Sequence, residues 1–467
     1  MGEDPARSGK LTFFGGAGTV TGSKYLLRAG KHQVLLDAGL FQGLKELRLR
    51  NWRRPDFDPT RLDSVVLSHA HIDHSGGLPL LVRSGFRGRI FCTSGTADLL
   101  KVMLLDAAKL QEEEAEYANR HDYSKHKLAL PLYTMKDAEA ALQRLEPSRY
   151  GRPFTVTKDV KAIFRRAGHI LGSATVEFQI GAEKLTRLVF SGDLGRWGQP
   201  ILRDPEFVPN ADILLVESTY GGRLHSKDPS GDLARIVNET VQKKGMLIVP
   251  SFAVGRAQLL VWMLRRLEEE GKIPSIPVYL DSPMAINVSD IYCRHPEDHD
   301  LDMTELMDQK RCPLCCKQYH LVSTVEESKA LNRLSGPAVI IAGNGMATGG
   351  RVLHHLQWRL PDPKTTVLLV GYQAAGTRGR SFQEGAKFVK MHGRQIPVNA
   401  KVEVIDGLSA HADRDDILRW LSGFKVPPRR TYLVHGEPDQ AEALARTIHG
   451  ELGWNVRPAV DGETVEI

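Results

Sequence analysis

The chain has 467 residues, which is too long for most single hydrophobic cores and predicts two domains or one domain with a large insertion. Its composition, 42% hydrophobic and 25% charged, is that of an ordinary globular protein, and its net charge of +6 permits a polyanionic substrate without requiring one. No apolar run reaches the roughly 20 residues that cross a membrane, and the polar start MGEDPARSGK has no apolar signal core, so we expect a cytoplasmic protein without a membrane partner.

Short apolar runs that end in glycine or in a polar cluster recur along the chain and predict buried strands. In chain order they are KLTFFGGAG, QVLLDAG, DSVVLSHAH, RLVFSGD, ILLVEST, MLIVPSF, AVIIAGN, TVLLVGY, VEVIDG and TYLVHG. Helical patterns lie between many of them, such as DLARIVNETVQKK, RAQLLVWMLRRLEEEG, RDDILRWLSGF and DQAEALARTIHGEL. This alternation favours a layered α/β fold.

The N-terminal part departs from this alternation. The segments YLLR, AGK and HQVLLD follow one another too closely for a helix, so we expect two strands joined by a tight turn. For the same reason GGAGTVTG, residues 15–22, is not predicted to bind a dinucleotide, because such a turn must open a helix. Residues 98–150 are charged and helix-like, and we expect helices and no strand there.

The five cysteines are an odd number and unevenly spread, which argues against a disulfide framework. They are Cys92, Cys293, Cys312, Cys315 and Cys316. Structural zinc sites usually have two paired ligand sets, and only the C-P-L-C segment is properly paired here. The sequence therefore favours buried, reduced thiols, and it leaves open whether Cys312, Cys315 and Cys316 bind a metal.

The segment SHAHIDHSGG, residues 68–77, gathers histidines and an aspartate directly after the apolar run VVL. His69 and His71 project to the same side if the chain stays extended, and Asp73 and His74 follow where the chain must turn. Imidazole and carboxylate groups suit Zn²⁺. The segment therefore predicts half of a metal site rather than a polar loop with incidental histidines.

Further side chains of ligand type stand in GHILGS, SGDLG and VHGE, as His169, Asp193 and His435. Each one alone is more often a cap or a satisfied polar group. Their shared position near strand ends favours a site, because open α/β sheets bind ligands beyond the carboxyl ends of their strands.

The order of these residues resembles the metallo-β-lactamase superfamily, in which Asp37, H-x-H-x-D-H, His169 and Asp193 follow one another in this way. The later segments ESTYG at 217–221, SAHAD at 409–413 and VHG at 434–436 resemble the three extra motifs of its β-CASP branch, a nucleic-acid-processing group. The resemblance runs from about residue 11 to the C-terminus. Within the branch, the chain is most similar to the RNA-cleaving nucleases related to the nuclease subunit of the cleavage and polyadenylation specificity factor.

The resemblance implies two Zn²⁺ ions per chain, bridged by Asp193, with Asp37 behind the ligands to fix their orientation by accepting hydrogen bonds. The implied ligands fall into two sets, one of His69, His71 and His169 and the other of Asp73, His74 and His435. Two such ions activate a hydroxide for in-line attack at phosphorus. The metal used in the cell stays open, because Mn²⁺ tolerates much the same ligands.

The resemblance also implies that His411 of SAHAD is the general acid and that Glu217 holds it by a hydrogen bond, with Asp73 as a further catalytic residue. An ion-pair partner raises the pKa of a histidine, which suits an acid that works near neutrality and leaves a 5′-phosphate and a 3′-hydroxyl. The residues alone permit another interpretation, in which Ser409 caps a helix and His411 has no role. In the family, a histidine at position 435 accompanies RNA-cleaving rather than DNA-processing members.

Contacts to substrate are predicted in three loops that follow strands, VPSFAVGRAQ, AGNGMATGGR and GYQAAGTRGR. Helix starts with a nearby guanidinium favour phosphate, although ordinary glycine turns are the alternative. The predicted contacts are Ser251, Arg256, Gly345, Arg351 and Arg378. The segment KELRLRNWRRP, residues 45–55, mixes basic residues with Trp52, and it either follows a single strand by charge and stacking or forms a solvated basic face.

The expected fold is α/β, an αββα metallo-β-lactamase sandwich formed by residues 1–219 and 381–467, with an inserted α/β β-CASP domain at 220–380. The expected function is that of a zinc-dependent ribonuclease, an endonuclease acting on single-stranded RNA. An additional 5′→3′ exonuclease mode and the choice between monomer and homodimer stay open. The alternatives are a hydrolase of small esters or thioesters, a DNA-directed nuclease and a non-catalytic RNA-binding scaffold.

Overall fold

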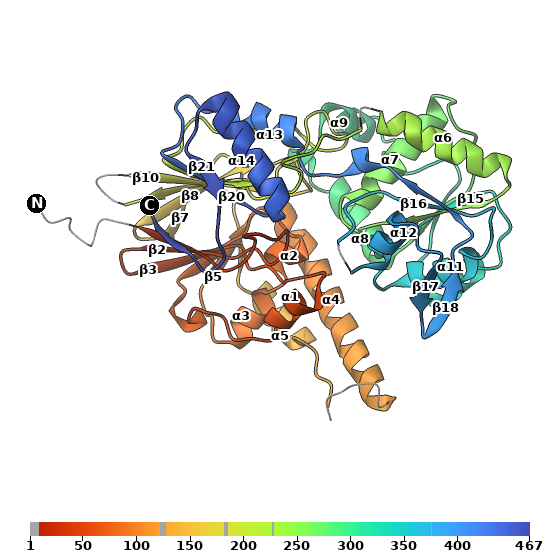
Figure 1. The fold of residues 1–467 in the computed structure, drawn as a ribbon, viewed down its shortest axis with the longest axis horizontal. Coiled ribbons are helices and arrows are strands. Elements are labelled where there is room, and N and C mark those ends of the chain that lie inside the picture. The colour runs from red at the N-terminus through yellow and green to blue at the C-terminus, as the bar shows by residue number, and fades with distance from the viewer. Residues whose placement is uncertain (1–8, 122–127, 182–184, 227, 375) are drawn as a thin grey trace, which may run out of the picture. The chain divides into compact units, whose positions relative to one another are not determined.

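The computed structural model describes residues 9–121, 128–181, 185–226, 228–374 and 376–467, which form two compact units (Figure 1). The first unit comprises Met1–Gln199, Arg203–Leu224 and His411–Ile467, and the second comprises Pro200–Leu202 and His225–Ala410. The second unit is therefore an insertion in the sequence of the first.

The first unit contains two seven-stranded sheets. One has the order β22-β1-β2-β3-β4-β5-β6, with β1 Lys10–Phe13, β2 Tyr25–Ala29, β3 His32–Leu36, β4 Ser64–Val66, β5 Arg89–Cys92, β6 Leu145–Pro147 and β22 Thr464–Glu466. The other has the order β21-β20-β11-β10-β9-β8-β7, with β7 Phe154–Thr157, β8 Val160–Arg166, β9 Ala174–Ile180, β10 Thr186–Phe190, β11 Ile213–Glu217, β20 Arg430–Val434 and β21 Val456–Pro458.

The two sheets pack against each other through one hydrophobic core. It joins Phe13 and Tyr25 of one sheet to Phe164, Phe178 and Phe190 of the other, and all five side chains are fully buried. Strands β2 and β3 form the predicted antiparallel hairpin, so the glycine-rich turn before them does not open a helix. The large apolar area removed from water here is the main stabilising contribution to the unit.

Helices cover the outer faces of both sheets, which confirms the αββα sandwich (Figure 1). Helices α13 and α14 pack on β10, β11 and β20 through a second apolar cluster that includes Trp420, Leu444 and Ile448. The helices of this unit are α1 Lys45–Arg50, α2 Ile72–Ser75, α3 Leu78–Arg83, α4 Ser94–Arg120, α5 Met135–Leu142, α13 Arg414–Leu421 and α14 Pro438–Leu452.

The second unit is built on a six-stranded sheet in which every pair of neighbours is parallel. Its order is β14-β13-β15-β12-β16-β19, with β12 Met246–Pro250, β13 Val278–Asp281, β14 Tyr319–Leu321, β15 Ala338–Ala342, β16 Thr366–Leu369 and β19 Lys401–Val404. A separate antiparallel hairpin consists of β17 Phe388–Met391 and β18 Arg394–Pro397. The helices are α6 Pro229–Gln242, α7 Arg256–Glu269, α8 Pro283–Cys293, α9 Leu301–Asp308, α10 Val325–Leu331, α11 Arg351–Arg359 and α12 Arg378–Gln383.

All ten predicted strand runs and all four predicted helical patterns are present as such elements. The expectation of no strand within residues 98–150 is wrong, because β6 pairs with β5 at the edge of the first sheet. The sequence placed the return to the first domain at residue 381. In the structure, residues up to Ala410 lie in the second unit, because β19 pairs with β16.

The prediction of buried, reduced thiols is wrong for two of the five cysteines. Cys312 is exposed and forms a disulfide with Cys315. Cys92 and Cys316 are buried and free, as expected, and Cys293 is free and half-buried.

Among the described residues, no helix combines the length and the apolar character that crossing a membrane requires.

Replacing Trp420 with alanine tests the packing of α13. The side chain is 1% exposed, and its indole N–H donates to the carbonyl of Glu206. We expect Trp420→Ala to lower the stability of the first unit by about 3–5 kcal/mol, since it removes a large buried side chain and leaves a cavity. Urea unfolding followed by circular dichroism measures this. The matched control is Trp358→Ala, at a position that is 66% exposed, and an equal loss in the two variants would contradict the packing described here.

Candidate metal centre and acid pair

The sequence-predicted ligands meet at one edge of the first unit, beyond the ends of its strands. Asp37 follows β3, and the segment of His69 to His74 follows β4. Asp193 follows β10 and His435 follows β20, while Glu217 is the last residue of β11. Since β10, β11 and β20 are parallel neighbours, the side chains at their carboxyl ends converge.

His69, His71 and His169 form one group of facing nitrogen atoms. The Nε2 atom of His69 is 3.1 Å from Nδ1 of His71, and Nε2 of His169 is 3.3 Å from the same atom. Burial, together with the neighbouring His69, lowers the pKa of His71 to about 3, and burial also lowers the pKa of His69. Neutral rings that turn their nitrogen atoms toward one point offer lone pairs to a cation.

Asp73, His74 and His435 form a second group, and their ligand atoms lie within 4.8 Å of one another. The Nε2 atom of His435 is 3.4 Å from Oδ2 of Asp73. His435 has φ of 48°, so its backbone takes the left-handed conformation that non-glycine residues rarely adopt. Such strain is commonly found at functional sites, where the surrounding structure maintains it.

Asp193 stands between the two groups and offers one oxygen to each. Its Oδ2 atom is 3.3 Å from Nε2 of His69 and 3.6 Å from Nε2 of His169. Its Oδ1 atom is 3.3 Å from Nε2 of His74 and 3.4 Å from Nδ1 of His435. The surrounding imidazoles hold the pKa of this carboxyl well below its usual range, although burial alone would raise it. Asp193 therefore faces both groups of ligand atoms.

Asp37 lies behind the ligands and accepts three hydrogen bonds. Nδ1 of His74 donates to its Oδ2 at 2.6 Å, and Ser68 donates to it both from the backbone N–H and from the hydroxyl, each at 2.7 Å. The Ser68 hydroxyl oxygen is also 3.0 Å from Nδ1 of His69. Asp37 therefore fixes the orientation of one ligand directly and of a second one through Ser68.

Two supporting residues, Ser68 and Thr219, were not identified from the sequence as site residues. The Thr219 hydroxyl is 3.1 Å from Nδ1 of His435 and also donates to the His435 carbonyl. Both residues stand inside segments that the sequence had singled out, next to His69 and Glu217. Their position within these motifs was the only hint of a role in the site. Serine and threonine are also common in ordinary turns, and no characteristic spacing distinguishes a supporting hydroxyl from such a turn residue.

His411 and Glu217 form a pair against Asp193. The Nδ1 atom of His411 is 3.1 Å from Oε2 of Glu217 and 3.9 Å from Oδ2 of Asp193. Burial alone lowers the pKa of His411, but the two carboxylates outweigh burial and raise it to about 8. The N-cap of α13 is Asp413, which accepts the N–H groups of residues 415 and 416, so helix capping does not account for His411.

Unsatisfied atoms in this cluster fit a metal site. Within the described part of the chain, Nε2 of His74 and Oδ1 of Asp193 are buried and have no hydrogen-bond partner. Nδ1 of His74 already donates to Asp37, while Nε2 lies 3.3 Å from Oδ1 of Asp193 without forming a hydrogen bond to it. A bound cation would satisfy both atoms.

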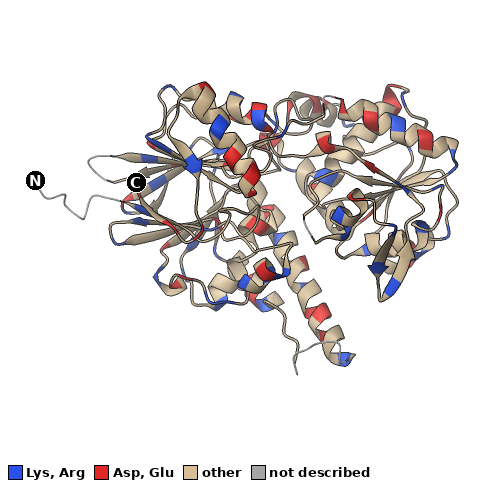
Figure 2. Ribbon diagram, in the orientation of Figure 1, with Lys and Arg blue, Asp and Glu red and all other residues tan. Residues whose placement is uncertain are grey.

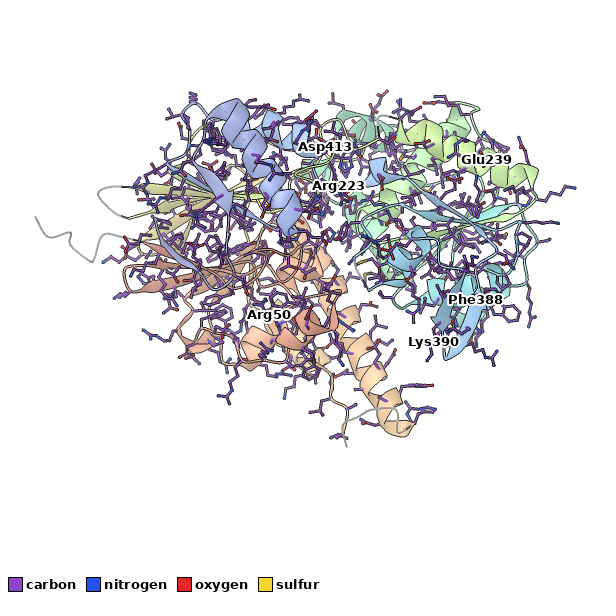
Figure 3. All side chains as sticks on the ribbon, in the orientation of Figure 1. Arg50, Arg223, Glu239, Phe388, Lys390 and Asp413 are labelled. Carbon is purple, nitrogen blue, oxygen red and sulfur yellow. A yellow bond between two sulfur atoms is a disulfide. The ribbon has the colours of Figure 1, made fainter. Side chains whose placement is uncertain are left out.

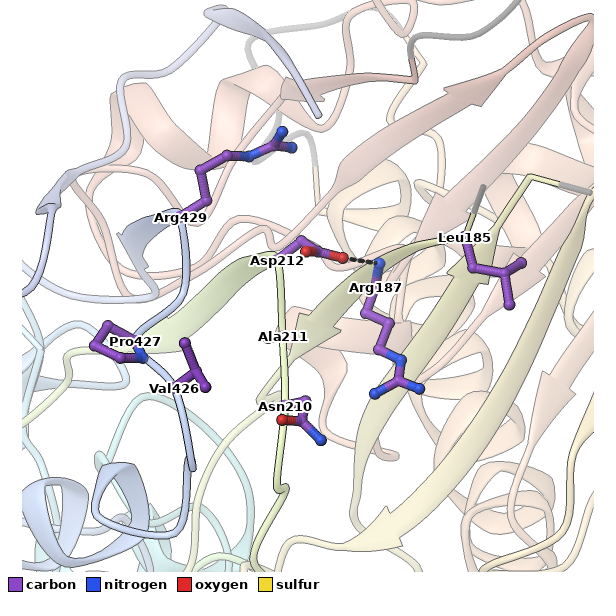
Figure 4. Close-up of a pocket in the computed structure, with 8 residues that line it drawn as sticks. All are labelled: Leu185, Arg187, Asn210, Ala211, Asp212, Val426, Pro427 and Arg429. Carbon is purple, nitrogen blue, oxygen red and sulfur yellow. Dashed lines mark hydrogen bonds between the residues drawn. The ribbon is translucent and has the colours of Figure 1, made fainter. Parts of the chain in front are cut away.

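One pocket of the first unit lies away from this cluster. It has a volume of about 520 Å³ and lies where β10, β11 and β20 begin, with Arg187, Asp212 and Arg429 in its lining (Figure 4). The polar cluster lies beyond the opposite ends of the same strands. We therefore assign no part of the metal chemistry to this pocket.

The predicted substrate contacts lie in the second unit. Arg256, Arg351 and Arg378 are the first residues of α7, α11 and α12, which follow the neighbouring strands β12, β15 and β16, so the structure brings all three to one edge of the sheet. Ser251 is buried directly after β12, and Gly345 packs so closely on Phe252 that a Cβ atom would lie 2.6 Å from its ring.

Two of these arginines also hold the loops together. Arg351 forms an ion pair with Asp281 at 2.7 Å and donates to the carbonyls of Val322 and Ser323. Arg378 donates to three backbone carbonyls, those of Ala347, Thr348 and Lys390. Their contact with phosphate stays a prediction.

The basic segment at 45–55 is also used in part for internal contacts. Arg50, which is labelled in Figure 3, forms an ion pair with Asp461 at 2.9 Å. Its guanidinium lies over the ring of Phe41 at 4.1 Å from the ring centroid. Trp52 is 57% exposed. The structure therefore leaves the indole accessible, while Arg50 is engaged within the unit.

Comparison with known proteins agrees with this geometry. Three family models match the chain, the Beta-lactamase superfamily domain over residues 32–230, the Beta-Casp domain over 257–382 and the Zn-dependent metallo-hydrolase RNA specificity domain over 395–458. Ribonuclease TTHA0252 of Thermus thermophilus is 38% identical over 460 residues, which cover 98% of this chain and 100% of that protein. This chain belongs to the β-CASP branch of the metallo-β-lactamase family.

More distant proteins also match nearly the whole of this chain. Transcription termination factor FttA of Methanosarcina mazei is 31% identical over 98% of this chain and 71% of that protein. A crystal structure of a protein of unknown function from Enterococcus faecalis V583 has a TM-score of 0.53 at 13% identity, covers 98% of this chain and 100% of that one, and shows a shared fold. The family is one of zinc-dependent metallo-hydrolases, and the His/Asp cluster is consistent with its metal site.

Replacing Asp37 with asparagine tests the support of the ligands. The change removes a buried charge and an acceptor for His74, and we expect metal affinity to fall by about 10- to 100-fold. Competition with a chromogenic zinc chelator measures the affinity. The matched control is Asp63→Asn, because Asp63 also accepts a backbone N–H near β3 but lies on the surface. Equal affinities of the Asp37 variant and the unchanged protein would refute the supporting role of Asp37.

Proposed function

We propose that this protein is a zinc-dependent ribonuclease that hydrolyses phosphodiester bonds in single-stranded RNA. The observation that carries the proposal is the Glu217–His411 pair, in which Nδ1 of His411 lies 3.9 Å from Oδ2 of Asp193. An acid placed beside a metal cluster suits a reaction whose leaving oxygen needs a proton. An RNA substrate is supported by the match to the RNA specificity domain and by the relative that is named a ribonuclease.

The chain's ligand atoms would hold two zinc ions, with one oxygen of Asp193 for each. The two sets are His69, His71 and His169 for one ion, and Asp73, His74 and His435 for the other. Two zinc ions held by these residues would lower the pKa of water and neutralise charge on the phosphate oxygens. Asp37 and Ser68 would keep the imidazoles aimed at the ions.

His411 would act as the general acid. Hydrolysis joins the oxygen of water to phosphorus and breaks the bond between phosphorus and the 3′ oxygen. Because Nδ1 of His411 faces Glu217, Nε2 would give its proton to the departing oxygen. The products are a 5′-phosphate and a 3′-hydroxyl. Glu217 would be a positioning residue, since it acts through His411 and keeps that ring protonated and fixed.

Replacing His411 with alanine tests this assignment. Chelator-stripped, zinc-reloaded protein is incubated with one single-stranded RNA labelled in parallel at its 5′ and 3′ ends, and with DNA of the same sequence. We expect the unchanged enzyme to cut the RNA, and His411→Ala to lower kcat by about 10²- to 10⁴-fold because the leaving oxygen loses its proton donor. The sizes of the labelled fragments distinguish endonuclease cleavage within the RNA from exonuclease trimming at its ends.

The zinc content of each variant, measured by mass spectrometry, separates the acid from the ligands. We expect His411→Ala to keep both ions, and the control His449→Ala, at an exposed helical position, to keep ions and activity. Loss of an ion from the His411 variant would place His411 among the ligands instead. If the two-zinc protein cleaves neither polymer, the nuclease proposal fails and small esters become the next substrates to assay.

A further inference from the structure

The hairpin of β17 and β18 in the second unit has a buried apolar face and an exposed face that carries aromatic, basic and amide side chains. Val389, Met391 and Ile396 belong to the core of this unit. Phe388, Lys390 and Gln395 are exposed, and Phe388 is 62% exposed. Figure 3 labels Phe388 and Lys390 on this hairpin. A single exposed phenylalanine is common on protein surfaces and does not by itself indicate a binding site. The residues around Phe388 therefore have to be considered.

The register of the hairpin places these exposed groups side by side. Phe388 pairs with Pro397, and Lys390 pairs with Gln395. Phe388 and Lys390 are two residues apart on one strand, so they project from the same face with a spacing of about 7 Å. The aromatic ring, the ammonium group and the amide therefore form one continuous surface.

This surface lines a pocket of about 420 Å³. Besides Phe388, Lys390 and Gln395, the lining includes Thr348, Arg378 and Ser381. Arg378 is held in place by three backbone carbonyls, one of them the carbonyl of Lys390. Those neutral acceptors orient the guanidinium but leave its positive charge uncompensated.

The region has an excess of positive charge. Residues 376–397 contain Arg378, Arg380, Lys387, Lys390 and Arg394 but a single acidic residue, Glu384, which pairs with Arg380 at 2.7 Å. None of the other four cations forms an ion pair with a carboxylate in the described part of the chain. Figure 2 shows the basic residues of the hairpin in blue. The uncompensated charge favours a polyanion.

An aromatic face beside unpaired cations is the combination that binds single-stranded nucleic acid with little sequence preference, through stacking of a base and attraction of the phosphate. Gln395 adds an amide that can donate to or accept from a base edge. Residues 383–394 lie between the regions matched by the Beta-Casp and RNA specificity models, so neither match accounts for Phe388 or Lys390.

We propose that this pocket is a nucleotide-binding subsite for single-stranded RNA, separate from the metal centre. A base stacks on Phe388, and the adjoining phosphate lies between Lys390 and Arg378. The choice of RNA as the polymer rests on the proposed function. The subsite contributes to binding of the strand and not to bond cleavage.

The test measures RNA binding apart from catalysis. A fluorescein-labelled single-stranded RNA of 20 nucleotides is titrated with zinc-loaded protein that carries His411→Ala, and anisotropy gives Kd. We expect Phe388→Ala to weaken binding about tenfold and Phe388→Trp to retain it, because tryptophan also stacks. We expect Lys390→Ala to weaken binding and to reduce the slope of log Kd against log salt by about one.

Two controls separate this subsite from general effects. Lys243→Ala removes the same charge from an exposed position on the second unit, and it should leave Kd unchanged. In the chain with His411 intact, hydrolysis of bis(p-nitrophenyl) phosphate, a diester without a base, should be equal for Phe388→Ala and the unchanged protein.

Unchanged RNA affinity in both Phe388→Ala and Lys390→Ala would overturn the proposal. The exposed face of the hairpin would then be tested for binding to a protein partner. If the protein binds RNA through Phe388 but hydrolyses no diester, the subsite stands and the proposed enzymatic function fails. The two proposals can therefore fail separately.

Discussion

The carboxylate of Asp193 is the group on which the site depends. It is buried, it has an oxygen toward each set of ligand atoms, and it also lies 3.9 Å from Nδ1 of His411. A buried carboxylate is costly without compensating positive charge, and the surrounding imidazoles hold the pKa of this one well below its usual range. Nε2 of His74 and Oδ1 of Asp193 nevertheless stay buried without a hydrogen-bond partner, and a bound cation would satisfy both atoms.

The sheet supplies the precision that this arrangement needs. Parallel pairing fixes the register of β10, β11 and β20, with Phe190 opposite Leu215 and Glu217 opposite Val434, so the residues that follow them are set by backbone hydrogen bonds. The core beneath consists of large, fully buried rings that resist displacement. Asp37 and His435 both adopt left-handed backbone conformations at the ends of their strands, and the stability of the sandwich holds these two residues in place.

Much of this fold could be predicted from the sequence because the parallel strands are buried on both faces and read as continuous apolar runs, as ILLVE of β11 does. Strand β8, VKAIFRR, was not predicted. Its burial alternates, so polar residues interrupt the run. The ligands were found because imidazole and carboxylate side chains have recognisable spacing. Ser68 and Thr219 have none, and the internal contacts of Arg351 and Arg378 depend on carbonyls that only the folded chain brings near.

The order of the ligands along the chain has a consequence for biosynthesis. Ribosomes release a chain from its N-terminus, so His69 to His74 emerge early, whereas His435 emerges after the whole inserted unit. An unfinished chain has the first ligand set but lacks both His411 and part of the second set. If the proposed function holds, the growing polypeptide cannot cut the messenger from which it is being translated. Hydrolytic competence would arrive only after residue 435 has been synthesised, so a product that terminates before this residue would be inert.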